Sequence, residues 1–210
     1  MKTPFEETKI GTALSGMIDL LAAGFLWLLC CLPVVTAGPA TAAFYYTVVK
    51  CVRHERSHVG AAFFGAFKSN FKSALLLWLA FLAFAAVTAA DAWAAKLMGS
   101  EAGLYAYGFW LLVIPGALVL PWLFAYVSRF ENSFGGTVKA CFYLSLKNIG
   151  NTLILLLILG LFGFVGWLLP QIIILLPGLC CLLMSYQIEP VFAKLVSGME
   201  DNNPDRWYNE

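Results

Sequence analysis

Ionisable residues near the ends of apolar segments are the side chains in this sequence best suited to chemistry. Asp19 and Glu189 each interrupt a long apolar run. A charge inside a bilayer is costly, so such residues are usually paired or functional. We predict that both join a cluster on the cytoplasmic side, which would form a polar path or a docking surface. Ordinary interfacial ion pairs and snorkelling side chains are the alternative. The predicted cluster contains Asp19, Lys50, Arg53, Arg129, Glu131 and Glu189.

The sequence gives little support for catalysis or metal binding. His54 and His58 are four residues apart, a spacing that can place two ligands on one helix face, but no third ligand is evident nearby. The six cysteines form no C-x-x-C pair. The glycine turn that begins at Ser133 lacks the lysine pattern of a phosphate-binding loop. We therefore expect no catalytic residue, no metal, no cofactor and no enzyme activity.

The composition is that of an integral membrane protein. Of the 210 residues, 61% are hydrophobic and only 12% are charged, and the mean hydropathy is +0.81. Soluble domains carry about 25% charged residues and cannot bury this much apolar surface. A net charge of +1 gives no basic field for binding nucleic acid. We expect an all-α polytopic protein with the lipid bilayer as its surroundings. A cleaved signal peptide is the alternative for residues 17–32.

The apolar runs predict about six transmembrane helices. The expected spans are residues 17–35, 40–52, 74–95, 104–127, 153–169 and 172–188. Residues 40–52 are short for a span, because a helix of that length reaches only about 20 Å. We expect a short, broken first hairpin, whose reversal is made by the turn residues Pro33, Gly38 and Pro39. A single crossing by residues 17–35 is the alternative.

Residues 60–72 and 138–148 are predicted to be amphipathic helices in the membrane interface. In the first, phenylalanine recurs every four residues and lysine occupies other positions. This pattern is typical of a helix whose apolar face enters the bilayer while its lysines meet headgroups or a partner. We predict that both serve as docking helices. The candidate docking residues are Phe63, Phe67, Lys68, Phe71, Lys72, Phe142, Leu146 and Lys147.

The distribution of lysine and arginine predicts the orientation of the chain. Basic residues gather around both amphipathic segments, whereas the connection near residue 100 and the turn at residues 170–171 carry few charges. Basic loops stay on the cytoplasmic side of a membrane. We therefore expect a multi-pass protein of the bacterial plasma membrane with both termini in the cytoplasm.

A shift of 79 residues aligns the two halves of the chain. It places Ala61 on Ala140, Lys68 on Lys147, and Lys50 on the cation Arg129. Both units run in the same direction, so the predicted repeat is parallel, with its axis along the membrane normal. We treat residues 1–210 as a single membrane domain. Its first half is residues 16–95, its second half is residues 104–195, and a polar cytoplasmic tail covers residues 196–210.

Three segments of the chain resemble a known family. They are "LPVVTAGPATAAFYYTVVKCVRHE", "FFGAFKSNFKSALLLW" and "LPWLFAYVSRFENSFGGTVKACFYLSLKNIGNTL". Together they look like the YesL-like family, small integral membrane proteins of Gram-positive bacteria with a domain of unknown function. Genes of that family often lie beside genes for carbohydrate ABC transporters and polysaccharide degradation. The resemblance implies a role near sugar uptake, with ABC-transporter subunits or another membrane protein as partners. It transfers no site residue.

Three functions follow from these observations. The leading hypothesis is an accessory or regulatory component associated with carbohydrate uptake, because the amphipathic helices offer patterned surfaces while the spans hold few polar residues. The alternative is a small transporter or permease that acts as an oligomer, which the repeat and the prolines within the spans favour. An intramembrane enzyme ranks last, because no pair of nucleophile and base is evident.

Overall fold

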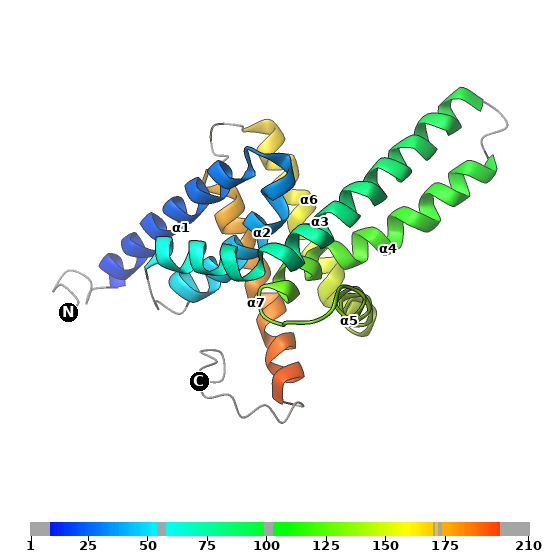
Figure 1. Ribbon diagram of the computed structural model, residues 1–210. Helices are drawn as coiled ribbons and strands as arrows, with labels where there is room; N and C mark the ends of the chain where they lie inside the picture. Colours follow the sequence, from blue (N-terminus) through cyan, green and yellow to red (C-terminus); the bar gives the residue numbers. More distant parts are fainter. Residues whose placement is uncertain (1–8, 54–57, 99–102, 170, 172–173, 198–210) are drawn as a thin grey trace.

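The computed structural model describes residues 9–53, 58–98, 103–169, 171 and 174–197, and its regular structure there is helical (Figure 1). The α-helices are α1 (Lys9–Cys31), α2 (Ala37–Thr47), α3 (Val59–Met98), α4 (Gly103–Val127), α5 (Phe134–Lys147), α6 (Ile149–Leu168) and α7 (Leu176–Ser197). A short 3-10 helix, η1 (Val34–Thr36), precedes α2, and a π-helix, η2 (Val48–Arg53), continues it. The predicted all-α fold is confirmed.

Five of these helices, α1, α3, α4, α6 and α7, are long and apolar enough to cross a membrane. The sixth predicted span corresponds to α2 together with η2. Helix α2 has only 11 residues, and most of them are buried by other parts of the protein. It packs mainly on α3, and also on α1 and α4. Because protein covers it on several sides, α2 does not need the length of a lipid-facing span.

The reversal between α1 and α2 differs from the prediction. It is made by Leu32 and η1, with Pro33 preceding the 3-10 turn in an extended conformation. The Thr36 hydroxyl donates to the Cys30 carbonyl at 2.6 Å and closes the turn. Gly38 and Pro39 instead lie in the first turn of α2. Proline is accepted there because the first backbone N–H groups of a helix have no partner within the helix.

Gly38 has a packing role that the Gly-Pro pattern concealed. A Cβ atom built at this position would lie 2.3 Å from Trp78 Cβ and 2.9 Å from the Ala74 carbonyl oxygen. Glycine therefore allows α2 and α3 to approach closely. Trp78 in turn donates from its indole Nε1 to the Val34 carbonyl at 2.7 Å. Trp78 thus packs against Gly38 and also bonds to the turn between α1 and α2.

The predicted boundary between residues 60–72 and residues 74–95 is wrong. Both segments belong to α3, a single helix of 40 residues. Its length of about 60 Å is roughly twice the thickness of a hydrocarbon core. Polarity suggested the boundary, but no glycine or proline lies between Ala66 and Met98 to end the helix.

The phenylalanines of this first part of α3 also differ from the prediction. Phe63 is fully buried in the protein core, and Phe67 stacks on it with ring centroids 6.2 Å apart. Phe67 and Phe71 are half-buried. Phe63 therefore faces other helices and not the bilayer or a partner. Lys68 and Lys72 are exposed, as predicted.

The second amphipathic segment is a separate helix, as predicted, but it begins at Phe134 and not at residue 138, so the predicted glycine turn after Ser133 is the first turn of α5. Ser133 caps α5 by accepting a hydrogen bond from the Gly136 backbone at its hydroxyl oxygen, and Asn148 separates α5 from α6 with φ −117° and ψ 48°. The predicted docking residues Phe142, Leu146 and Lys147 are exposed. The two predicted repeat units therefore differ, because α3 continues through the position at which α5 ends.

The remaining elements follow the predicted pattern with shifted ends. Helix α4 nearly matches residues 104–127 and contains Pro115 and Pro121. Helix α6 begins four residues earlier than predicted, and α7 continues to Ser197 with Pro190 inside. Most of the predicted tail at residues 196–210 lies outside the described residues, as does Pro170 of the predicted turn.

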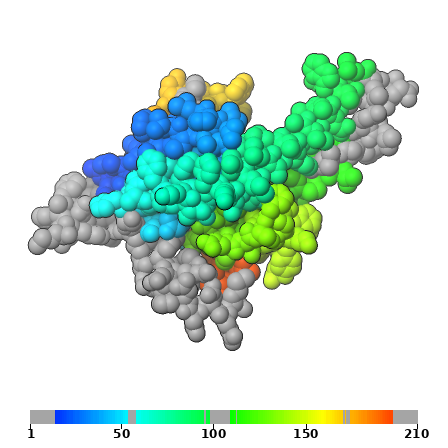
Figure 2. Space-filling view, viewed as in Figure 1, coloured from blue at the N-terminus to red at the C-terminus, as the bar shows by residue number. Residues whose placement is uncertain are grey.

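The helices alternate in direction. In Figure 1, α1, α3 and α6 end toward the upper part of the view, whereas α4 and α7 end toward the lower part, where α5 lies. Helix α2 runs back from the end of α1. Figure 2 shows α5 in yellow-green below the teal side chains of α3. We call the lower end, which includes η2, the end of α4 and the second half of α7, the charged end of the bundle.

Candidate functional site

A buried ion pair lies at the charged end. Arg129, just after α4, pairs with Glu189 of α7, and their side chains are only 4% and 11% exposed. The hydroxyl of Tyr45, a buried residue of α2, donates to the other Glu189 carboxylate oxygen at 2.8 Å. A pair shielded in this way is charge-assisted and geometrically specific. It joins α2, α4 and α7 at one point.

A second arginine binds α7 one turn earlier. Arg53 of η2 donates to the Ser185 backbone carbonyl at 2.8 Å, and its guanidinium lies 4.7 Å from the centroid of the Tyr186 ring. Ser185 and Glu189 are four residues apart and so lie on one face of α7. The last helix therefore receives one arginine from each half of the chain.

Lys50 lies in the same π-helix as Arg53 but has different neighbours. Its ammonium group donates to the Tyr46 hydroxyl at 3.1 Å and sits 5.2 Å from the centroid of that ring. In an α-helix, residues three apart lie on nearly the same face. The wider winding of a π-helix turns them apart, and π segments often occur at functional sites. This winding lets Lys50 contact Tyr46 while Arg53 contacts α7.

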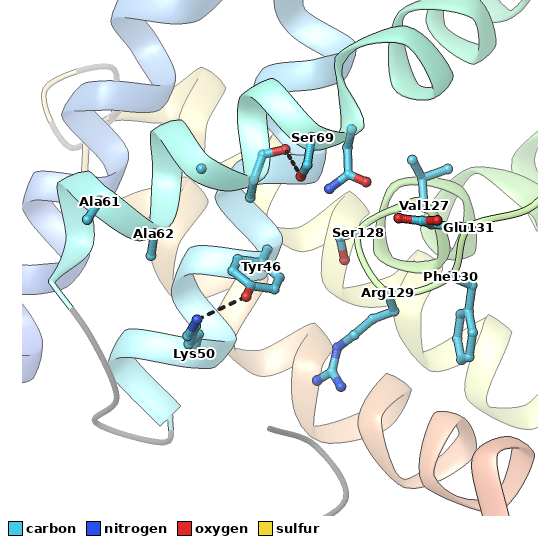
Figure 3. A pocket seen from close by; sticks show the side chains of 13 residues that line it. Tyr46, Lys50, Ala61, Ala62, Ser69, Val127, Ser128, Arg129, Phe130 and Glu131 are labelled. Carbon is cyan, nitrogen blue, oxygen red and sulfur yellow. Dashed lines mark hydrogen bonds between the residues drawn. The ribbon is translucent and has the colours of Figure 1, made fainter. Parts of the chain in front are cut away.

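A polar pocket of about 310 Å³ opens beside Lys50. Figure 3 shows Lys50 and Tyr46 on one side of it, with Ser128, Arg129 and Phe130 on the other. Small residues of α3 line a further part, and Glu131 is exposed. The lining residues are Tyr46, Lys50, Ala61, Ala62, Gly65, Ala66, Ser69, Asn70, Val127, Ser128, Arg129, Phe130 and Glu131.

Most of the predicted cluster is brought together. Arg129 and Glu189 form the ion pair, Arg53 binds α7 next to it, and Lys50 and Glu131 line the pocket with Arg129. Lys50 and Arg129, which the 79-residue shift aligns, thus meet at one cavity. Asp19 is half-buried on α1, and His58 is its electrostatic neighbour.

Sequence reasoning missed the partners of these charges. Tyr45, Ser185 and Tyr186 contact them in the structure, but nothing in their type pointed to that role. A signal was available for Tyr46, because it lies four residues before Lys50 on a helical segment.

A second missed signal is a motif. Residues 54–58 read H-E-x-x-H, which in zinc hydrolases places two histidine ligands and a general base on one helix. The expectation of no metal did not take Glu55 into account. His58 is exposed and directly precedes α3, while residues 54–57 lie outside the described part. Among the described residues, no group of three His, Cys, Asp or Glu side chains could hold a metal ion.

Several polar side chains within the spans are hydrogen-bonded to neighbouring residues. Trp27 donates to the Thr41 hydroxyl at 3.2 Å, and Trp122 donates to the Thr152 hydroxyl at 3.1 Å. The Thr88 hydroxyl donates to the carbonyl of Ala85, three residues earlier on the same helix. In α5, outside the spans, burial raises the pKa of the Cys141 thiol to about 12, so this cysteine stays protonated at physiological pH.

A family profile matches part of this chain. Searches of the curated proteins and of the solved structures returned no match. The sequence profile of a family described as "Protein of unknown function, DUF624" matches residues 20–92. The matched region runs from α1 through the first hairpin and η2 to the later turns of α3, and includes Lys50, Arg53 and the α3 side of the polar pocket.

Proposed function

We propose that this chain is an accessory or regulatory membrane protein that binds a partner protein at its charged end. The observation that carries the proposal is the uneven placement of polar groups. The ion pair, the two cations of η2 and the polar pocket all lie at the charged end. Within the spans, the hydroxyl and indole groups of Trp27, Thr88 and Trp122 are already bonded to neighbouring residues.

A transported sugar would need the opposite arrangement. Ligand sites in membrane transporters lie near the bilayer midplane and expose groups that can bond the substrate. Polar groups that are bonded to neighbouring residues offer less to a ligand. The polar pocket, by contrast, is lined by side chains from η2, α3 and the α4–α5 connection, and it combines cations, a carboxylate and aromatic rings. Such a surface suits a partner with both polar and acidic groups.

The exposed lysines next to this end supply the charge for docking. Lys68 of α3 and Lys147 of α5 are both exposed, and Lys147 lies 5.4 Å from the centroid of the Tyr143 ring. We propose an acidic cytoplasmic segment of a transporter subunit as the partner. The link to carbohydrate uptake in a Gram-positive bacterium rests on the resemblance to the YesL-like family. The match to a family of unknown function over residues 20–92 is compatible with that narrower grouping.

Charge reversal at these lysines tests the docking proposal. Lys68→Glu with Lys147→Glu should remove the copurifying partner from native membranes solubilised in mild detergent, because two attractions become repulsions. The variant should remain inserted and folded, since both side chains are exposed. Lys96→Glu, an exposed lysine near the other end of α3, is the matched control and should keep the partner. Unchanged recovery of the partner with the double variant would contradict the proposal.

We also propose that the charged end faces the cytoplasm. The basic residues at this end and the charge-poor turns at the opposite end support that orientation. A cysteine introduced at the exposed residue Gln171 should react with a membrane-impermeant maleimide in intact cells. A cysteine at the exposed residue Lys72 should react only after permeabilisation. The unmodified protein, whose own cysteines are half-buried or buried, is the control. Labelling at position 72 in intact cells would show that the charged end faces the outside of the cell.

A small transporter acting as an oligomer is the second candidate. It is favoured by one observation, the convergence of the repeat-related cations Lys50 and Arg129 on a single cavity. Purified protein in liposomes distinguishes the two candidates. If the chain alone moves a solute down its gradient, the accessory proposal is replaced by the transporter.

The H-E-x-x-H motif favours a third candidate, a metal-dependent hydrolase. In such enzymes two histidines bind zinc and the glutamate acts as general base. A carboxylate is an accepted third ligand, and Asp19 is an acidic side chain near His58. Zinc analysis of the purified protein and of His58→Ala tests this candidate. One zinc per chain that is lost in the variant would replace the accessory proposal.

A further inference from the structure

A second cavity, which we call the apolar groove, lies further along α3 than the polar pocket. It has a volume of about 640 Å³ and is bounded by α3, α4 and α5. Apolar side chains such as Phe81, Leu120 and Phe142 line most of it. Lys139 of α5 is the charged residue among the described residues that line it, and it is exposed.

The dimensions of the groove match one leaflet of a bilayer. Along α4 it extends from Leu111 to Leu123, which corresponds to roughly 18 Å of helix. Half of a hydrocarbon core is about 15 Å thick. Leu123 lies near the end of α4, which is followed by Arg129 of the ion pair and by α5. The groove therefore runs from the charged end toward the middle of the α4 span.

Helix α5 supplies both an apolar wall and a cation. Phe134, Val138 and Phe142 recur every four residues along its exposed side, and all three line the groove. Lys139 follows directly after Val138 and also lines the groove. The apolar groove is as long as one leaflet, and α5 places a cation beside it. These features complement an amphiphile that has an acyl chain and an anionic phosphate headgroup.

We propose that the apolar groove binds one anionic phospholipid, with an acyl chain along α4 and the phosphate group at Lys139. The inference does not depend on the proposed docking function, because Lys68, Lys147 and the polar pocket take no part in it. The lipid would fill the space between α3 and α5, which make few direct contacts with each other. It would thereby hold the interfacial helix against the bundle.

Retention of lipid by the full-length protein tests the headgroup part. The probes are nanodiscs of phosphatidylglycerol or of phosphatidylcholine, followed by native mass spectrometry of the released protein. Wild type should keep one phosphatidylglycerol and little phosphatidylcholine. Lys139→Gln should weaken that retention about fivefold, the effect of one basic residue at a membrane surface. Lys147→Gln, on the same helix but outside the groove, should leave it unchanged.

A second pair of variants tests the acyl-chain part. Ala80→Trp places a large ring in the groove from α3 and should abolish retention, whereas Ala86→Trp, on an exposed position of α3 outside the groove, should not. Inorganic phosphate should not compete, since it lacks the acyl chain. Equal retention of both lipids, competition by phosphate, or retention that neither Lys139→Gln nor Ala80→Trp reduces would overturn the proposal.

Discussion

Glu189→Leu is expected to destabilise the protein by about 3–5 kcal/mol, because it removes one partner of a buried ion pair. The leucine leaves the Arg129 guanidinium, which is 4% exposed, without its carboxylate. It also removes the acceptor of the Tyr45 hydroxyl. On the scale of globular domains of this size, the unfolding temperature in detergent should fall by roughly 6–20 °C. Thermal unfolding of the purified protein, followed by circular dichroism, measures the change.

Two further variants distinguish the effect of the ion pair on stability from the effect of losing a charge in general. Glu131→Gln removes an exposed carboxylate two residues from Arg129 and should change stability little. Arg129→Met combined with Glu189→Leu should recover much of the loss, because apolar residues of similar size can replace a buried ion pair at low cost. An unfolding temperature of Glu189→Leu equal to that of the wild type would show that the pair is not coupled to folding.

Gly38→Ala is expected to cost about 3 kcal/mol, near the upper end of the range for overpacking. The new methyl group would lie 2.3 Å from Trp78 Cβ and 2.9 Å from the Ala74 carbonyl oxygen, and neither atom can move without the α3 backbone. Displacing Trp78 would also strain its bond to the Val34 carbonyl in the turn. Thermal unfolding in detergent is again the measurement.

Gly160→Ala on α6 is the matched control for this substitution. Nothing lies within 4 Å of a Cβ atom built at Gly160, so the same chemical change meets open space. Alanine also has a higher helix propensity than glycine by about 1 kcal/mol. The control should therefore be as stable as the wild type or more stable. Equal stability of the two alanine variants would mean that α2 and α3 are not packed as closely as described.

Helix positions in the second half could be predicted from the sequence because local signals were sufficient there. Helix α4 is bounded by polar residues, which fixes its ends. The start of α5 was predicted at residue 138 and lies at Phe134, because two glycines after Ser133 suggested a turn although Ser133 caps the helix. The continuity of α3 could not be read from polarity. A change from amphipathic to apolar residues alters what a helix faces, but only a breaker such as proline or a capping residue ends it.

The role of Gly38 and the composition of the charged end required tertiary information. A Gly-Pro pair is a turn signal, and nothing local distinguishes it from a close approach to Trp78, which lies forty residues further along the chain. The gathering of charges could be predicted because charges collect at the ends of membrane helices. Their bonding to Tyr45 and Ser185 depends on the rotation of α2 and α7 about their own axes, which the sequence pattern does not specify.

The attachment of both arginines to α7 has a consequence for the order of synthesis. The Ser185 carbonyl that receives Arg53 and the carboxylate that receives Arg129 both belong to α7, which is synthesised after α1 to α6. During translation, α1 to α6 are inserted before either ligand has been made. The charged end can therefore be assembled only after α7 has been synthesised, and a nascent chain that is released before Ser185 lacks both ligands. Such a product would lack the contacts that join η2 and the end of α4 to α7.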